Sequence, residues 1–290
     1  MQTIKSYLSL VKFSHTIFAL PFAAIGFIIG IHSSPEWVVN YKLLIWIFVC
    51  MVTARNAAMA FNRWADRDID ALNPRTQMRE IPAGIISANK AIFFVLVNSM
   101  LFVWSASQIN FVCFILSPLA LAIVLGYSFT KRYFWLCHLF LGLGLALAPL
   151  GAFLAVRGSL ELLPSMYALA VVSWVAGFDI IYALQDVEFD VSHHLKSIPA
   201  KFGIRTSLWI SSALHFICGV CILSATYLLH RDYGLNDGIY FGSAAFIILL
   251  ISQHIIVGKG DLSKINLAFF STNGLASICL AVGIIIDFYF

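Results

Sequence analysis

The chain has 290 residues, of which 61% are hydrophobic and only 11% are charged, and its mean hydropathy is +0.90. Soluble domains carry about 25% charged residues, so this composition predicts an integral membrane protein. The formal net charge of +4 gives no electrostatic support to a nucleic-acid partner, and we expect the basic residues to reflect membrane topology instead.

Nine windows of about twenty apolar residues divide the chain into candidate transmembrane helices. Pro21 and Pro149 fall inside the first and fifth windows, where proline can kink a helix. The pattern predicts an all-α integral membrane protein, a single domain over residues 1–290 with about nine transmembrane helices in a bundle. The windows cover residues 14–31, 43–66, 88–107, 110–128, 134–155, 164–187, 206–229, 238–257 and 265–287.

Lysine and arginine predict the orientation of these spans. Only the connections from Arg67 to Ser87 and from Glu188 to Arg205 are long and rich in charge. Alternation of nine spans places both on the side of the N-terminus with fourteen basic residues, against three on the other side. The positive-inside rule then makes the N-terminus and both loops cytoplasmic and the C-terminus external. The fourteen are Lys5, Lys12, Arg63, Arg67, Arg75, Arg79, Lys90, Lys131, Arg132, Lys196, Lys201, Arg205, Lys259 and Lys264.

The second span ends in polar groups that recur every four residues: Asn62, Asp66 and Asp70. This spacing predicts that the three side chains line one helical face, within about 80° and over roughly 12 Å. Hard oxygen ligands on one face suit Mg²⁺, which binds one or two carboxylates and completes its shell with water and substrate phosphate. The pattern predicts a magnesium-diphosphate site at the membrane surface, although a solvated helix end is the simpler alternative.

The sixth span ends in a second acidic pattern, in which Asp179, Tyr182, Asp186 and Asp190 share one helical face. Asp186 follows Asp66 by 120 residues and Asp190 follows Asp70 by 120, and an Ile-Pro-Ala tripeptide comes soon after each pattern, at 81–83 and 198–200. This echo predicts two related four-helix units, about residues 1–133 and 134–260, each with one Asp-rich motif, and an additional ninth helix.

Two carboxylate clusters on one membrane face would repel each other without cations between them. We therefore expect about two Mg²⁺ ions among the four aspartates of the motifs, with Asn62 as a neutral ligand or donor. Basic side chains near both patterns are placed to neutralise the oxygens of a diphosphate. These are Lys131 and Arg132, which follow Tyr127 at the end of the fourth span, and Arg75, Arg79 and Lys196 in the loops.

Arg55 lies eleven residues before Asp66, about 16 Å deeper along the helix, where a charge needs an inward-facing partner. Two interpretations stay open at this point. Arg55 binds the carboxylate of an acidic aromatic acceptor, or it pairs structurally with Asp179. In the first case Asp179 and Tyr182 are available to hydrogen-bond to a hydroxyl group of the acceptor.

The resemblance to a known family rests on both Asp motifs, on the segment Gly126-Tyr127-Ser128-x2-Lys131-Arg132 and on the loop Asn73-Pro74-Arg75-Thr76-x2-Arg79. With these features the chain resembles, over nearly its whole length, the UbiA superfamily of intramembrane aromatic prenyltransferases. The segments 14–21 and 55–63 are similar to the bacterial 4-hydroxybenzoate polyprenyltransferase group, which includes enzymes that act on a dihydroxynaphthoate for menaquinone. The chain departs from the pattern at His193-His194-Leu195-Lys196, where a glycine is expected before Ser197. His193 and His194 as metal ligands are a further alternative.

The resemblance implies a transferase in the bacterial inner membrane that moves a polyprenyl group from polyprenyl diphosphate to the ring of 4-hydroxybenzoate for ubiquinone, or of a dihydroxynaphthoate for menaquinone. Mg²⁺ and the basic groups would stabilise the departing diphosphate, and the electron-rich ring would attack the allylic cation in a dry, aromatic-rich cavity.

Two other classes of membrane protein also use acidic helices. An ion-coupled transporter predicts ionisable groups near mid-membrane, which only Arg55 and Asp179 provide. The CDP-alcohol phosphotransferases carry a longer Asp-rich pattern that is absent ahead of Asp66. The sequence therefore favours the prenyltransferase.

Overall fold

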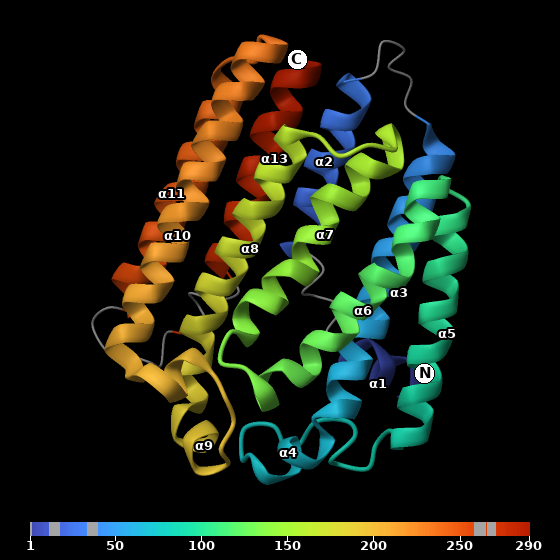
Figure 1. Ribbon diagram of the computed structural model, residues 1–290, viewed down its shortest axis with the longest axis vertical. Helices are drawn as coiled ribbons and strands as arrows, with labels where there is room; N and C mark the ends of the chain where they lie inside the picture. Colours follow the sequence, from blue (N-terminus) through green and yellow to red (C-terminus); the bar gives the residue numbers. More distant parts are fainter. Residues whose placement is uncertain (1, 12–17, 34–39, 258–264, 266–270) are drawn as a thin grey trace. The chain divides into compact units, whose positions relative to one another are not determined.

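The computed structural model describes residues 2–11, 18–33, 40–257, 265 and 271–290, and every regular element in these ranges is a helix (Figure 1). Lys12, Lys259, Lys264 and residues 14–17 of the predicted first span lie outside the described residues. The chain divides into two compact units, Met1–Thr16 with Val39–Thr130, and Ile17–Val38 with Lys131–Phe290. We refer to them as the first and the second unit.

The first unit is built on two packed helices, α3 and α5. Asn40 caps α3 by accepting hydrogen bonds from the amides of Lys42 and Leu43, at 3.1 and 3.3 Å, and Ser87 caps α5. Small residues, among them Ala57 and Ala60, are fully buried in its core. The helices are α1 (Gln2–Leu10), α3 (Tyr41–Ala65), α4 (Arg67–Leu72), α5 (Ala88–Ser107) and α6 (Phe111–Tyr133), the last three residues of which belong to the second unit.

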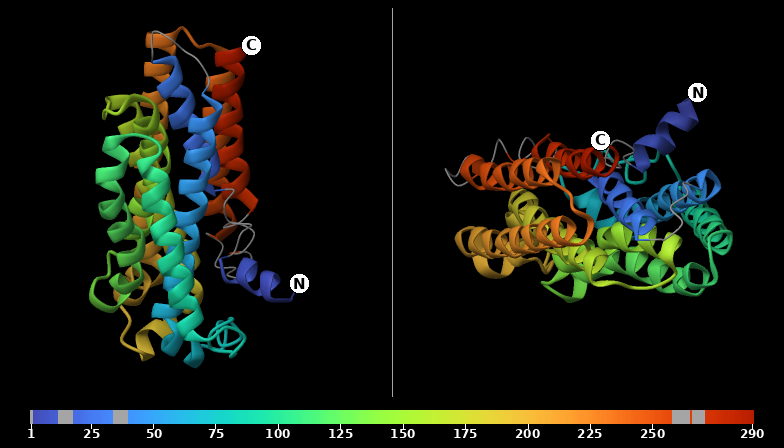
Figure 2. Two further views of the ribbon diagram at one scale, coloured as in Figure 1. Left: turned by 90° about the vertical axis from the view of Figure 1, so that its right-hand side faces the viewer. Right: turned by 90° about the horizontal axis from the view of Figure 1, so that it is seen from above.

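The second unit packs its helices around Trp174, which is fully buried between Phe22, Phe178 and Phe246. Helices α11 and α13 run side by side in both views of Figure 2. The helices are α2 (Leu20–His32), α7 (Cys137–Arg157), α8 (Leu162–Ala183), the 3-10 turn η2 (Leu184–Asp186), α9 (Val187–Ser192), α10 (Ile198–Tyr233), α11 (Asp237–Val257) and α13 (Asn273–Tyr289).

Close backbone contact explains one glycine of the second unit. A Cβ atom at Gly26 would collide with the carbonyl group of Pro149, so only glycine lets α2 approach α7 at this point. The two prolines have different places in their helices. Pro21 lies in the first turn of α2, where proline is well tolerated, and Pro149 lies inside α7.

Seven helical runs are long and apolar enough to cross a membrane: α3, α5, α6, α7, the run Leu162–Ser192, α10 and α11. They match the second to the eighth predicted spans. The predicted start at residue 206 agrees with a kink at Gly203 (φ 75°, ψ 172°), which separates the first turn of α10 from its main part. The first and ninth predicted spans coincide in part with the shorter apolar helices α2 and α13, so the count of nine stays a prediction.

Candidate active site

The first acidic motif lies across a break between two helices, and the prediction of one continuous helical face is wrong here. Helix α3 ends at Ala65, Asp66 takes φ −91° and ψ 3°, and the short α4 follows. The guanidinium of Arg67 donates a 2.9 Å hydrogen bond to the carbonyl of Trp64, which a continuing helix would pair with the amide of residue 68. This substitution of a side chain for a backbone partner gives a local reason for the break.

Two backbone hydrogen bonds meet at Asp66, one on each side of the break. The amide of Asp66 donates to the carbonyl of Asn62 at 2.9 Å, and the amide of Asp70 donates to that of Asp66 at 2.7 Å. The side-chain amide of Asn62 also donates to Asp66 Oδ2 at 3.2 Å. Asp66 is only 2% exposed, so this carboxylate lies buried beside an amide that orients it.

Asp70 is paired with a base that the sequence assigned to the diphosphate. Arg79 Nη1 donates to both carboxylate oxygens of Asp70, at 2.7 and 2.8 Å, and the Asp70 side chain is 5% exposed. The hydroxyl of Thr76 donates to the Asp70 carbonyl at 3.1 Å. Asp70 and Arg79 therefore form a largely buried ion pair that fixes the loop to α4.

The loop after α4 begins with a turn around Asn73. Its side-chain oxygen accepts from the amide of Arg75 at 2.9 Å, and its carbonyl accepts from the amides of Thr76 and Gln77. The turn leaves the Arg75 side chain exposed and leads the chain back to Arg79. Of the two loop arginines predicted to bind the diphosphate, Arg75 is thus the exposed one and Arg79 is half-buried.

Two further basic groups lie on α3. Arg55 is half-buried, and Tyr127 of α6 interacts with it electrostatically. Arg63 is only 5% exposed, and it interacts with the carboxylates of Asp70 and Glu80. Residue spacing did not single out Arg63 for this cluster, because it follows Asn62 directly and adjacent residues of a helix point about 100° apart.

The second motif has the same backbone feature as the first. Asp186 takes φ −107° and ψ 6° where η2 meets α9, and the side-chain amide of Gln185 donates to the carbonyl of Tyr182 at 3.1 Å. Helix α9 has six residues, as α4 has, and begins 120 residues after it. Asp66 and Asp186 thus share the sparsely populated bridge conformation, in which many active-site residues are found.

Asp190 is held by a residue that the sequence did not single out. Ser197 Oγ donates to Asp190 Oδ2 at 2.9 Å and accepts from the amide of Ala200, so this serine both fixes the carboxylate and caps α10. Lys131 attracts Asp190 electrostatically, whereas Asp186 repels it. A serine directly before Ile-Pro was the available signal, because this is the N-cap position of a helix that opens with proline.

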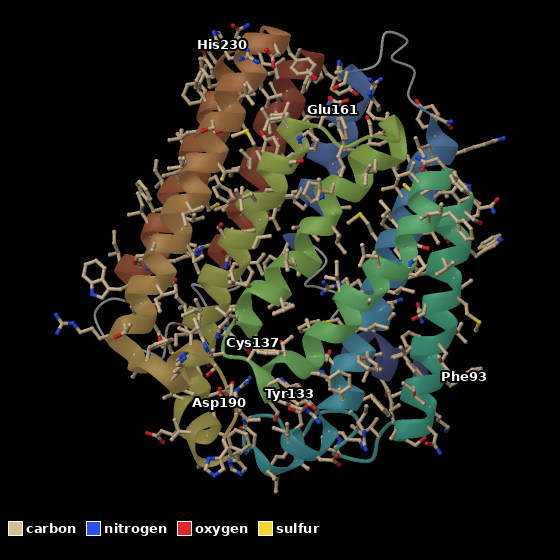
Figure 3. The ribbon with its side chains drawn as sticks, viewed as in Figure 1. Phe93, Tyr133, Cys137, Glu161, Asp190 and His230 are labelled. Carbon is tan, nitrogen blue, oxygen red and sulfur yellow. The ribbon has the colours of Figure 1, made fainter. Side chains whose placement is uncertain are left out.

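The segment before α10 is hydrogen-bonded to the last turn of α6. The amide of Lys196 donates to the carbonyl of Lys131 at 2.7 Å, and its ammonium donates to that of Tyr133 at 3.1 Å. The ammonium of Lys201 lies 4.3 Å from the ring centre of Trp135. Arg132, in the last turn of α6, is half-buried. Figure 3 shows Asp190, Tyr133 and Cys137 at one end of the unit, away from Glu161 and His230.

Asp179 has a partner that neither interpretation of the sequence proposed. His138 Nδ1 lies 2.7 Å from Asp179 Oδ2, and the amide of Ile198 donates to His138 Nε2 at 3.4 Å. Within the second unit Asp179 therefore has a histidine partner, and its pairing with Arg55 stays a prediction. Tyr182, one turn after Asp179, is half-buried.

The sequence departure at His193 and His194 falls in an exposed turn. The ring of His193 stacks on Phe189 with centroids 4.0 Å apart. His194 has φ 55°, the left-handed conformation that favours glycine, so the departure places a histidine where glycine would be unstrained. Neither histidine belongs to a metal-ligand cluster in the described residues.

The donor set of the two motifs fits Mg²⁺. No three His, Cys, Asp or Glu side chains of the described residues form a ready cluster for a metal ion. Mg²⁺ does not need one, because it keeps several waters and uses one or two carboxylates together with substrate phosphates. The first unit offers the buried Asp66 with the Asn62 amide beside it, and the second offers Asp186 and Asp190.

Two surface hollows lie apart from the predicted site residues, none of which lines either of them. A hollow of about 500 Å³ in the second unit is lined by Leu162, Met166 and Tyr227, among others. A hollow of about 380 Å³ in the first unit is lined by residues that include Tyr7, Lys90 and Phe93. Both are open and mostly apolar, as expected of surfaces that face lipid.

Comparison with known proteins gives consistent matches. The model of the UbiA prenyltransferase family matches residues 19–275. A 4-hydroxybenzoate octaprenyltransferase of Nitrosomonas eutropha is 30% identical over 263 residues, 89% of this chain and 88% of that protein. One of Paraburkholderia phytofirmans is 34% identical over 254 residues, 86% of this chain and 84% of that protein.

Solved structures resemble the chain as well. A UbiA homologue from Aeropyrum pernix, solved in the apo form, has a TM-score of 0.83 at 34% identity and covers 94% of this chain and 98% of its own. A UbiA homologue from Archaeoglobus fulgidus, solved with DMAPP and Mg²⁺, has a TM-score of 0.66 at 20% identity, covering 96% of this chain and 99% of its own. The second likeness is one of fold.

Proposed function

Because the chain belongs to the UbiA prenyltransferase family, we propose that it transfers a polyprenyl group from polyprenyl diphosphate to the ring of 4-hydroxybenzoate, with Mg²⁺ as its cofactor. Relatives that bear the name 4-hydroxybenzoate octaprenyltransferase support this choice of acceptor. The reaction would serve ubiquinone biosynthesis. Membership of an enzyme family leaves the transporter interpretation without support.

One observation carries the assignment of the diphosphate site. Asp66 and Asp186, 120 residues apart, adopt the same bridge conformation at a helix break, and each is followed four residues later by a second aspartate. A solvated helix end gives no reason for a break at the same place in both motifs. We therefore assign Asp66, Asp70, Asp186 and Asp190 to Mg²⁺ binding, with Asn62 as the neutral group that orients Asp66.

The basic residues would stabilise the charge that develops as the allylic C–O bond breaks. Bound Mg²⁺ supplies positive charge to the same oxygens. We assign Arg75, Lys131, Arg132 and Lys196 to the diphosphate. Arg79 takes a different role, because its ion pair with Asp70 already holds it: it orients that carboxylate.

The acceptor would be bound by polar groups deeper in the helices. We assign the carboxylate of 4-hydroxybenzoate to Arg55, beside Tyr127, and its hydroxyl to Asp179 and Tyr182. The ring carbon next to the hydroxyl attacks the allylic carbon, and loss of the ring proton restores aromaticity. Water must be excluded from the allylic cation, because it would convert the cation to an alcohol. Buried aromatic side chains exclude water and stabilise positive charge with their ring faces.

We expect membranes that contain the protein to prenylate 4-hydroxybenzoate when they are given polyprenyl diphosphate and Mg²⁺. EDTA should abolish turnover, and excess Mg²⁺ should restore it, because the aspartates bind the diphosphate through the metal. The measurement is the mass-identified prenylated product, with membranes that lack the protein as the control. Turnover that persists in EDTA would contradict the metal assignment.

The same assay tests the acceptor by direct competition between 4-hydroxybenzoate and 1,4-dihydroxy-2-naphthoate at equal concentrations. Prenylated 4-hydroxybenzoate should dominate. If the naphthoate product dominates, the protein acts in menaquinone biosynthesis instead, and the assignment of the diphosphate site is unchanged.

We also propose that the protein lies in a bacterial inner membrane with its N-terminus and both Asp motifs on the cytoplasmic side. The excess of basic residues near these motifs supports this orientation. A single cysteine introduced at the exposed Met78, in a cysteine-free background, should react with a membrane-impermeant maleimide in inverted vesicles and not in intact spheroplasts. The opposite labelling pattern would reverse the topology.

A further inference from the structure

We propose that His138 is a positioning residue that orients Asp179 for the acceptor hydroxyl and ties it to the segment that holds Asp190. The proposal deepens the proposed function and rests on it. His138 carries no role in the sequence motifs, and its position at the start of α7 separates it from both of them by more than forty residues along the chain.

The hydrogen bonds of His138 determine where its proton lies. The backbone amide of Ile198 can only donate, and it donates to Nε2 at 3.4 Å. A neutral imidazole with Nε2 as its acceptor carries the proton on Nδ1, which is 2.7 Å from Asp179 Oδ2. Nδ1 therefore donates to the carboxylate, and this bond selects one rotamer of Asp179.

Burial separates the roles of the two residues. The His138 side chain is 3% exposed, whereas that of Asp179 is 23% exposed. The Asp179 carboxylate is therefore partly accessible, whereas the imidazole is not. A buried imidazole in a membrane helix is costly unless both nitrogens are hydrogen-bonded, and both are bonded here. His138 therefore acts through Asp179 rather than on the substrate.

The hydrogen bond between His138 and Ile198 connects His138 to the residues assigned to Mg²⁺ binding. Ile198 opens α10, and the preceding residue, Ser197, donates to Asp190 and caps the same helix. The imidazole thus lies between a carboxylate assigned to the acceptor and a helix start that holds a carboxylate assigned to Mg²⁺. Through these contacts α7 links the two binding functions of the second unit.

The test compares two replacements of His138. His138→Phe keeps a ring and removes both hydrogen bonds, whereas the amide of His138→Asn can occupy the place of Nδ1–H and donate to Asp179. His138→Phe should raise the KM for 4-hydroxybenzoate by about tenfold, the usual effect of losing a hydrogen bond to a charged group. The KM for polyprenyl diphosphate should change by less than about threefold, and His138→Asn should restore most of the acceptor KM.

A matched control removes another buried hydrogen bond from the same unit. Thr226 and Ser243 are bonded at 2.6 Å between α10 and α11, and Thr226→Val deletes this bond with little change of shape. It should lower the melting temperature in detergent without changing the acceptor KM. An acceptor KM that rises equally in Thr226→Val and His138→Phe would reduce His138 to a general packing role and overturn the proposal.

A double-mutant cycle keeps the proposal testable if His138→Phe proves poorly folded. His138→Ala also removes both hydrogen bonds, and alone it should raise the acceptor KM about tenfold. In an Asp179→Asn background it should add less than about twofold to the acceptor KM, because the residue acts only through Asp179. Additive effects would overturn the proposal. An inactive wild-type protein would contradict the proposed function, whereas an active wild type with an unchanged KM in His138→Phe contradicts only the role of His138.

Discussion

Replacing Asp66 with alanine is expected to lower the rate of prenyl transfer by about a thousandfold or more, because the diphosphate would lose a metal ligand that stabilises its charge in the transition state. Asp186→Ala should have a comparable effect. Saturating Mg²⁺ should restore little of the rate, since alanine offers no oxygen ligand. The measurement is kcat with Mg²⁺ titrated over a wide range.

Both variants should stay folded and inserted, for a reason that the geometry provides. Backbone hydrogen bonds lie on both sides of the break at Asp66, the side chain of Arg67 supports it, and none of these contacts needs the carboxylate. The loss of one 3.2 Å hydrogen bond from Asn62 is a small cost. Size-exclusion chromatography in detergent checks the fold.

Neighbouring carboxylates provide the matched controls. Asp68 is 81% exposed and pairs loosely with Arg67 at 3.6 Å, and Glu188 is exposed on α9. Asp68→Asn and Glu188→Gln remove a charge at nearly the same positions and should leave kcat within about twofold. Near-normal Mg²⁺-dependent turnover in both Asp66→Ala and Asp186→Ala would refute the site assignment.

Hydropathy predicted the positions of the membrane helices well, because lipid demands long apolar runs with internally satisfied backbones. The second to eighth spans match helices of the described chain, with ends that differ by a few residues. The predicted halves, about residues 1–133 and 134–260, stay a prediction. The matching positions of the short helices α4 and α9 support them. The shared tripeptide does not, because it forms a turn at Ile81–Ala83 and opens a helix at Ile198–Ala200.

The breaks at Asp66 and Asp186 were not predictable from residue spacing. At each break a side chain, Arg67 or Gln185, bonds to a carbonyl group three residues earlier, and hydrophobic periodicity carries no information about such bonds. The spacing of the aspartates nevertheless singled out Asp66 and Asp186, whose backbone dihedral angles are alike.

The partners of the charged residues could not be predicted from the sequence either. His138 meets Asp179 from a different helix, and no local pattern connects residues 41 positions apart. Composition can say that a membrane-buried charge needs a partner, and that requirement directed attention to Arg55 and Asp179. Which side chain meets the requirement is decided by tertiary packing alone.

Arg79→Ala is the second replacement with a large expected effect, and this effect should be on stability. It would leave the Asp70 carboxylate, 5% exposed, without its ion-pair partner, and we expect a loss of about 2–3 kcal/mol, below the full cost of breaking a buried pair because Arg79 is 24% exposed. Unfolding in detergent with increasing SDS measures this loss. Turnover should fall too, because Asp70 is no longer oriented for the metal.

Two companion variants separate the role of Arg79 as a partner of Asp70 from the role as a diphosphate ligand that the sequence predicted. Only one nitrogen of Arg79 contacts both oxygens of Asp70, so the single ammonium of Arg79→Lys should retain much of the stability. The double replacement Asp70→Asn with Arg79→Met removes both charges and should recover most of the lost stability while staying inactive. The opposite result is that Arg79→Ala is as stable as the wild type and raises only the KM for polyprenyl diphosphate. Arg79 would then be a diphosphate ligand, and substrate binding would break its ion pair with Asp70.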